Sequence, residues 1–251
     1  MRPIAASALC LFLSCLPAFG HEAQPLIVPD VVDGGGWQTT IAITNGEPAP
    51  GTVTLTFHSD TAGGGTQIWT PAFLETSSTT SLLIPGGSTI YLHTRGTAAS
   101  LTQGWAQLDA EEGILAYVIF TNRVPGKQDQ DATAPAVAAT NRILVPFDNS
   151  TGFATAIAVA NTSAIAQTIA ATFRVTGGQI IQGSLPTVPA LGHMTFVLPQ
   201  QFTATAGKSG LAEFYSPTGD FSLIALRFNP TLSSTASPAY FMIGPPLITA
   251  Q

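Results

Sequence analysis

The side chains that could carry chemistry are few and widely separated in this sequence of 251 residues. The histidines are His21, His58, His93 and His193, and both cysteines lie before residue 20. Nucleophilic catalysis requires a serine or cysteine beside a histidine that an acid orients, and a Gly-x-Ser-x-Gly turn is a common way to present the serine. The sequence contains no such turn. We therefore predict no catalytic residues.

One place brings three candidate side chains together, at His58, Ser59 and Asp60. Neighbours along a strand point to opposite faces, which separates His58 from Ser59. The matching position in the second copy of a repeat, described below, is Arg174. This exchange predicts that His58 lies on a solvated polar face.

The acidic residues do not form a convincing site. Glu111 and Glu112 directly precede Gly113, which indicates the tip of a hairpin rather than a pair of catalytic carboxylates. Asp30 and Asp33 lie close to a run of glycines and are interpreted as turn residues. Too few carboxylates gather there for a calcium cage, so no metal or cofactor is predicted.

The sharpest chemical alternative is His21. If the chain is processed before this residue, its amine and imidazole could both bind one metal, and nitrogen ligands suit Cu(II). Copper-binding β-sandwich proteins use such an arrangement, with a second histidine. One of the other three histidines would have to complete the site, giving a copper carrier or a copper-dependent oxidase.

The tryptophans provide a second alternative. Trp37 corresponds to Phe153 in the repeat and is predicted to be core. Trp69 adjoins a segment found only in the first copy, and Trp105 lies on a face shared with Gln107. The core interpretation is preferred for Trp69 and Trp105. If exposed, either could stack on a sugar, as in a carbohydrate-binding module.

The composition excludes whole classes of partner. Only 9% of the residues are charged, 45% are hydrophobic and the formal net charge is −6. Nucleic acids and anionic membrane surfaces attract basic proteins, so neither is an expected partner. Ample apolar side chains also argue against disorder. The expected partner is an extracellular protein or a polysaccharide.

Residues 1–20 are typical of a secretory signal peptide. Arg2 precedes an apolar run over 4–16, and Ala18 and Gly20 supply the small side chains needed for cleavage. The run is too short to span a membrane, and no later segment is long and apolar enough. We expect a secreted or periplasmic protein. Lipidation at Cys15 is a competing interpretation.

The chain also resembles itself. The segment 37–45 returns as 153–161, a shift of 116 positions from 37 to 153. Further on, 104–108 returns as 210–214, a shift of 106 positions from 104 to 210. The difference places about ten extra residues in the first copy, near 70–81. The sequence therefore predicts an internal duplication.

Both copies alternate with a period of two, which is typical of strands with one buried face. Residues 115–120 and 221–226 are apolar on both faces and are predicted to be central strands. The fold class predicted is all-β, with two tandem Ig-like β-sandwich domains. They are assigned to 21–123 and 142–251, and the polar segment 124–141 is predicted to be the linker, although 136–138 could pair as an edge strand.

Three segments support a family resemblance. They are GWQTTIAITN at 36–45, PGGS at 85–88 and GFATAIAVAN at 152–161. The chain resembles a group of exported bacterial proteins built from paired Ig-like sandwiches, and the resemblance covers nearly all of the predicted mature chain. It implies the fold and leaves the activity open.

The functional expectation follows from these points together. The repeat uses most of the apolar positions and leaves no converging set of titratable groups. We therefore expect a secreted, non-enzymatic protein that supplies an interaction, adhesion or structural surface. Copper binding through His21 and glycan binding through Trp69 or Trp105 remain as alternatives.

Overall fold

The computed structural model of the chain describes residues 24–75, 81–126, 128–230, 234–237 and 239–242. Within them the regular secondary structure is antiparallel strand, apart from a four-residue helix α1 (Leu198–Gln201) and a 3-10 turn η1 (Thr203–Thr205). The all-β prediction is confirmed. The predicted signal peptide, Cys15 and His21 lie outside the described residues.

The first half of the chain forms a single nine-stranded sheet. Its strands are β1 (Leu26–Gly34), β2 (Trp37–Asn45), β3 (Gly51–Asp60), β4 (Thr66–Trp69), β5 (Ser81–Ile84), β6 (Thr89–His93), β7 (Thr102–Ala110), β8 (Ile114–Asn122) and β9 (Gln130–Pro135). The order is β4-β3-β7-β1-β2-β8-β9, with β5 also paired to β3 and β6 to β2. Strand β1 pairs along β7 but meets β2 only at Asp33 and Gly34, so the sheet folds over on itself.

The alternation of side chains explains why this sheet closes. In β3, Val53, Leu55 and Phe57 are buried and the threonines between them are partly exposed. The buried face packs in one cluster with Ile41 of β2 and Val118 of β8, which come from the opposite layer. Each such side chain contributes about 1.5–3 kcal/mol when fully buried.

The second half has two sheets. Its strands are β10 (Arg142–Asp148), β11 (Ala154–Asn161), β12 (Ala170–Val175), β13 (Ile180–Ser184), β14 (His193–Val197), β15 (Ser209–Tyr215), β16 (Phe221–Phe228), β17 (Ser234–Ser237) and β18 (Tyr240–Met242). One sheet has the order β13-β12-β15-β10-β18 and the other β14-β11-β16-β17. Phe173 and Phe214 from the first sheet share a core with Ile157 and Leu223 from the second.

The strand pairings of the second half follow those of the first. Strand β7 lies between β1 and β3, as β15 lies between β10 and β12. Strand β2 lies between β6 and β8, as β11 lies between β14 and β16. Strand β9 borders β8 as β17 borders β16.

A buried asparagine ends the corresponding strands β2 and β11. Asn45 Nδ2 donates to the carbonyl oxygen four residues ahead, and its Oδ1 accepts from the amide two residues ahead. Asn161 makes the same two bonds. Each Nδ2 also donates to a carbonyl far along the chain, that of Ile84 at the end of β5 or that of Val188. These bonds satisfy loop carbonyls that would otherwise be buried without a partner.

The segment 124–141 corrects the linker prediction. It contains β9, which pairs with β8 along its whole length. Gln130 lies opposite Asn122 at one end and Pro135 opposite Tyr117 at the other. Val137 then forms a bridge with Ile27 of β1. The polar composition that suggested a linker belongs instead to a strand at the edge of the first sheet, where outward side chains meet solvent.

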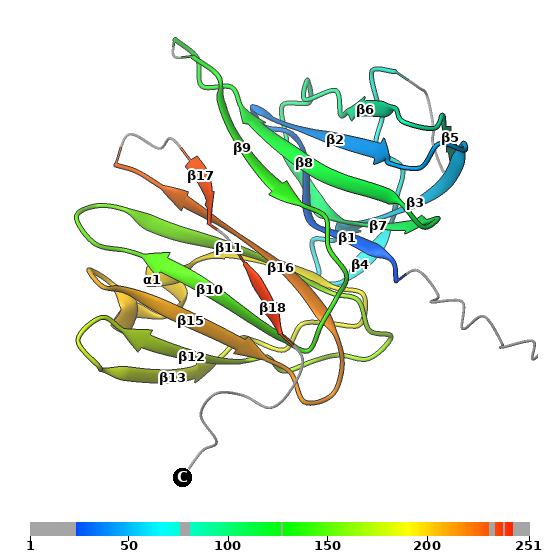
Figure 1. Cartoon of the computed structure of the whole chain (residues 1–251). Helices are drawn as coiled ribbons and strands as arrows, with labels where there is room; N and C mark the ends of the chain where they lie inside the picture. The colour runs from blue at the N-terminus through cyan, green and yellow to red at the C-terminus, as the bar shows by residue number, and fades with distance from the viewer. Residues whose placement is uncertain (1–23, 76–80, 127, 231–233, 238, 243–251) are drawn as a thin grey trace, which may run out of the picture.

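The two halves pack against each other, as Figure 1 shows. Strand β1 contacts β11 and β16, and β7 contacts β14. Side chains from both halves share one apolar cluster, in which Ala158, Ile224 and Leu226 contact first-half residues. None of the helices in the described ranges has the length and apolar character needed to cross a bilayer.

Candidate functional site

Trp105, a candidate for sugar stacking, is fully buried in β7. Its ring stacks on His58 of β3, with 4.4 Å between the ring centroids and 10° between the planes. Its Nε1 donates a 2.9 Å hydrogen bond to the carbonyl oxygen of Leu191 in the second half. Trp105 therefore connects the two halves and offers no open face to an external sugar.

The prediction of a solvated His58 is wrong. Its exposed fraction is 6%, because Trp105 covers the ring. Burial lowers the pKa of His58, since desolvation disfavours the charged imidazolium. Arg174, at the corresponding place in the second half, instead bonds to the buried carboxylate of Glu213. The comparison of His58 with Arg174 in the sequence could not show that the Trp105 ring covers His58.

Trp69 is partly buried and packs against the first-half core. Its ring meets Phe57 edge to face, with 6.3 Å between centroids. Core packing therefore uses part of the indole, in line with the preferred interpretation, and glycan stacking at Trp69 stays a prediction.

The described histidines are held in three different environments. His93 bonds to Glu75 on the outside of the first half, His58 stacks on Trp105, and His193 bonds to Asp60. Among the described residues, no group of three or more His, Cys, Asp or Glu side chains is arranged to bind a metal. The copper hypothesis depends on His21, which lies outside these residues.

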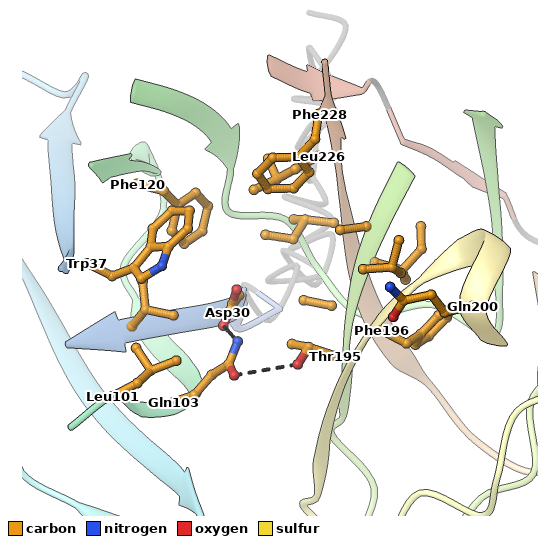
Figure 2. A pocket seen from close by; sticks show the side chains of 16 residues that line it. Asp30, Trp37, Leu101, Gln103, Phe120, Thr195, Phe196, Gln200, Leu226 and Phe228 are labelled. Carbon is orange, nitrogen blue, oxygen red and sulfur yellow. Dashed lines mark hydrogen bonds between the residues drawn. The ribbon is translucent and has the colours of Figure 1, made fainter. Parts of the chain in front are cut away.

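A cavity of about 420 Å³ lies between the two halves. Figure 2 shows Trp37 and Phe120 from the first half on one side and Phe196 and Gln200 from the second half on the other. Trp37, predicted to be core, is thus partly buried and also forms a cavity wall. Cavities of this size at a boundary between domains are common ligand sites.

One end of this cavity is polar. Gln103 Nε2 donates a 3.1 Å hydrogen bond to Asp30 Oδ1, and Thr195 Oγ1 donates to Gln103 Oε1 at 3.5 Å (Figure 2). His193 Nε2 lies 3.6 Å from the same Asp30 oxygen, and its Nδ1 lies 2.9 Å from Asp60 Oδ2. The polar groups therefore connect strands of both halves.

This arrangement does not form a catalytic triad. The His193 side chain is fully buried, and its Nε2 has no hydrogen-bond partner among the described residues. A nucleophilic hydroxyl would have to bond to that nitrogen for the histidine to activate it. The second neighbour of His193 is instead the carboxylate of Asp30, which cannot act as the missing hydroxyl.

Asp30 is a buried carboxyl group with an altered pKa. Its pKa rises to about 6, mainly because burial disfavours the carboxylate. His193 and the hydrogen bond from Gln103 oppose this rise, and Asp60 adds to it. The interpretation of Asp30 as a turn residue is wrong, because it lies inside β1 and lines the cavity.

The pH dependence of stability tests this description of Asp30. Its pKa is raised on folding from 3.8 to about 6, so the folded state binds more protons between these values. The free energy of unfolding should therefore fall as the pH rises through this window, by about 2 kcal/mol from this group between about pH 4.5 and about pH 8. Asp30→Asn should remove the fall, which urea unfolding at about pH 4.5 and about pH 8 would measure.

Asp109→Asn is the matched control, since Asp109 is exposed on β7. It should keep the pH dependence of the natural protein. An Asp30→Asn variant whose stability changes with pH as the natural protein's does would show that Asp30 is not a buried titrating group.

A second surface, the outer face of the first half, lies on β6, β2, β8 and β9. Its middle row runs from Tyr91 through Ala42 and Tyr117 to Pro135, each paired with the next across the sheet. Tyr91 and Tyr117 are 45% and 36% exposed, whereas Ala42 between them is buried. The Tyr117 hydroxyl donates to Tyr91, which favours the neutral phenol and raises the pKa of Tyr117, so the two phenols lie side by side over Ala42.

The neighbouring rows of this outer face are mostly uncharged, apart from His93, which lies across from Thr40 beside Tyr91 and bonds to Glu75. Leu115, 65% exposed, pairs with Thr44, whose hydroxyl bonds to Thr89 at 2.8 Å. On the other side of the tyrosines, Thr40 and Thr133 flank Ile119. The surface is therefore a patch of tyrosine, leucine and threonine on regular strands.

The corresponding face of the second half is covered. There Ala158 takes the place of Ala42, between Thr195 of β14 and Ile224 of β16. Ala158 and Ile224 belong to the apolar cluster shared with the first half. The same sheet face thus makes a contact within the chain in one half and faces outward in the other.

Sequence reasoning missed the outer face. Residues 115–120 were predicted to form a central strand, and β8 does lie between β2 and β9. However, Leu115 and Tyr117 point outward and are exposed. Their alternation with Ile114, Ala116 and Val118 was a usable signal, but alternation does not say whether the second face is covered.

No family model matches this sequence, and no curated protein matches it. The function is therefore inferred from the fold and from these two surfaces.

Proposed function

We propose that this chain is a secreted, non-catalytic protein of two duplicated Ig-like sandwiches, and that the outer face of its first half binds a protein partner. The observation that carries the proposal is the exposure of Leu115, Tyr91 and Tyr117 where the equivalent second-half face is buried in a contact. Tyrosine is enriched and charge is depleted in the centres of protein interfaces.

The corresponding strand pairings and the matching bonds of Asn45 and Asn161 support the duplication. The pattern of residues 1–20 supports export. Export and low charge both favour a partner outside the cytoplasm.

A protein partner is favoured over a glycan by the contact within the chain. The second half uses this sheet face against protein, through Ala158 and Ile224. Trp105, by contrast, is buried. Interface centres of this kind gain most of their affinity from a few aromatic and aliphatic anchors, here Tyr91, Tyr117 and Leu115.

Site-specific photocrosslinking tests the proposal. A diazirine side chain at position 115 of the full chain, in the cell that makes it, is expected to give one discrete adduct of higher mass. The matched control is position 180 on β13, where Ile180 is 52% exposed outside this surface. Replacing Tyr91 and Tyr117 with serine should reduce the adduct about tenfold, because tyrosine anchors dominate such contacts.

The adduct should contain a second polypeptide, identified by its peptides. Absence of an adduct at 115, equal adducts at 115 and 180, or an adduct that contains only polysaccharide would contradict the proposal.

A further inference from the structure

The cavity between the halves is a concave site lined by both halves, whereas the outer face of the first half is an open sheet surface. Sixteen residues line it, six from the first half and ten from the second. Because its two walls come from separate sheets, it exists only when the halves are packed together. Its volume, about 420 Å³, falls in the range that encloses a small organic molecule.

Aromatic rings provide much of the wall. Trp37 and Phe120 face the cavity from the first half, and Phe196 and Phe228 from the second (Figure 2). Leu101 adds an aliphatic contact. Such walls bind an apolar body, and the faces of aromatic rings also attract organic cations.

The charge of the cavity is negative and partly uncompensated. Asp30 is the only charged residue among the sixteen that line it, and none of them is Lys, Arg or His. The nearest basic group is the imidazole of His193, 3.6 Å away. A buried carboxylate is stabilised by a cation brought against it, and this gain is larger inside the protein than in water.

The hydrogen bonds at this end hold the carboxylate in place. Gln103 donates to Asp30 and accepts from Thr195, and these two bonds keep its amide beside the carboxylate. A carboxylate can only accept hydrogen bonds, so a group that bonds to Asp30 must donate. This requirement selects ligands with N–H or O–H donors and disfavours anions.

We propose that this cavity binds a small organic amine, whose ammonium group donates to the Asp30 carboxylate while its apolar body lies between Trp37, Phe120 and Phe196. The site is independent of the outer face of the first half, so a protein partner there and an amine here would bind separately.

Calorimetric titration of the full chain with phenethylamine tests the proposal, and quenching of tryptophan fluorescence gives a second readout because Trp37 lines the site. Phenethyl alcohol is the neutral comparison and phenylpropionate the anionic one. The amine should bind about tenfold or more tightly than the alcohol, as expected for a charge-assisted hydrogen bond, and the anion should not bind.

Asp30→Asn should reduce the preference for the amine about tenfold and leave binding of the alcohol unchanged. Asp109→Asn, the exposed control, should bind both probes as the natural protein does. The proposal is overturned if the amine does not bind, if the anion binds better, or if Asp30→Asn keeps the full preference for the amine. These outcomes leave the protein-binding proposal unchanged, because crosslinking at position 115 tests it separately.

Discussion

Replacing Glu213 with glutamine is expected to reduce the free energy of unfolding by about 3–5 kcal/mol. Glu213 is 2% exposed on β15 and lies between two arginines. Its Oε1 accepts from Arg142 Nε at 2.8 Å, and its Oε2 accepts from Arg174 Nη2 at 3.1 Å. Without the carboxylate, two guanidinium groups share a poorly hydrated site and lose the ion pairs that the described residues provide, so the loss exceeds that of an ordinary surface ion pair.

Chemical denaturation followed by circular dichroism measures this change. Gln107 occupies the matching place on β7 of the first half and bonds to Asp109 at the surface, so Gln107→Leu is a suitable control with a change of about 0.5 kcal/mol or less. A loss below about 1 kcal/mol for Glu213→Gln would mean that the three charges are hydrated rather than buried.

The second large effect is expected at Trp105. Trp105→Ala should destabilise the protein by about 3–5 kcal/mol, because it removes the largest fully buried side chain and leaves a cavity. The change should also loosen the contact between the halves, since the Nε1 bond to Leu191 crosses it. Phenethylamine binding should weaken with it, as the binding cavity depends on that contact.

Trp105→Phe separates packing from the hydrogen bond. It keeps an aromatic ring beside His58 and leaves the Leu191 carbonyl without its donor, at a cost of about 1–3 kcal/mol. If Trp105→Ala unfolds at the same denaturant concentration as the natural protein, the halves do not depend on this residue.

Local patterns in the sequence predicted the strands because burial in a sheet repeats every two residues. The predicted period of two is seen in β3, where Val53, Leu55 and Phe57 share the buried face. Glycines near the ends of β1 and at the hairpin before β8 were predicted to be turns. Gly34 and Gly113 adopt positive φ angles of 87° and 81° there, which few other residues tolerate.

The same patterns could not predict which faces are covered by the other half. His58 was expected in solvent and is covered by Trp105, while β8 was expected to be covered and is open at Leu115. Asp30 was assigned to a turn and lies in a wall formed with Thr195, far along the chain. Each difference arises from contacts between distant segments, which alternation does not encode.

The composition of segment 124–141 was misleading for a related reason. Its polar residues suggested a linker, but an edge strand such as β9 also exposes one face to water. In β9, Asp131, Thr133 and Pro135 are exposed and Ala132 and Ala134 are buried. Small buried residues give a weak hydrophobic signal, so the edge strand was considered only at 136–138, directly after β9.

The central claim is that one sheet face contacts protein within the chain in the second half and contacts a partner in the first. The most direct measurement is photocrosslinking with the same diazirine side chain at two matched positions, Tyr117 and Ile224, which pair with Ala42 and Ala158. We expect position 117 to give an adduct with another polypeptide and position 224 to link only to the first half of its own chain. Adducts with other polypeptides at both positions, or at neither, would contradict the claim.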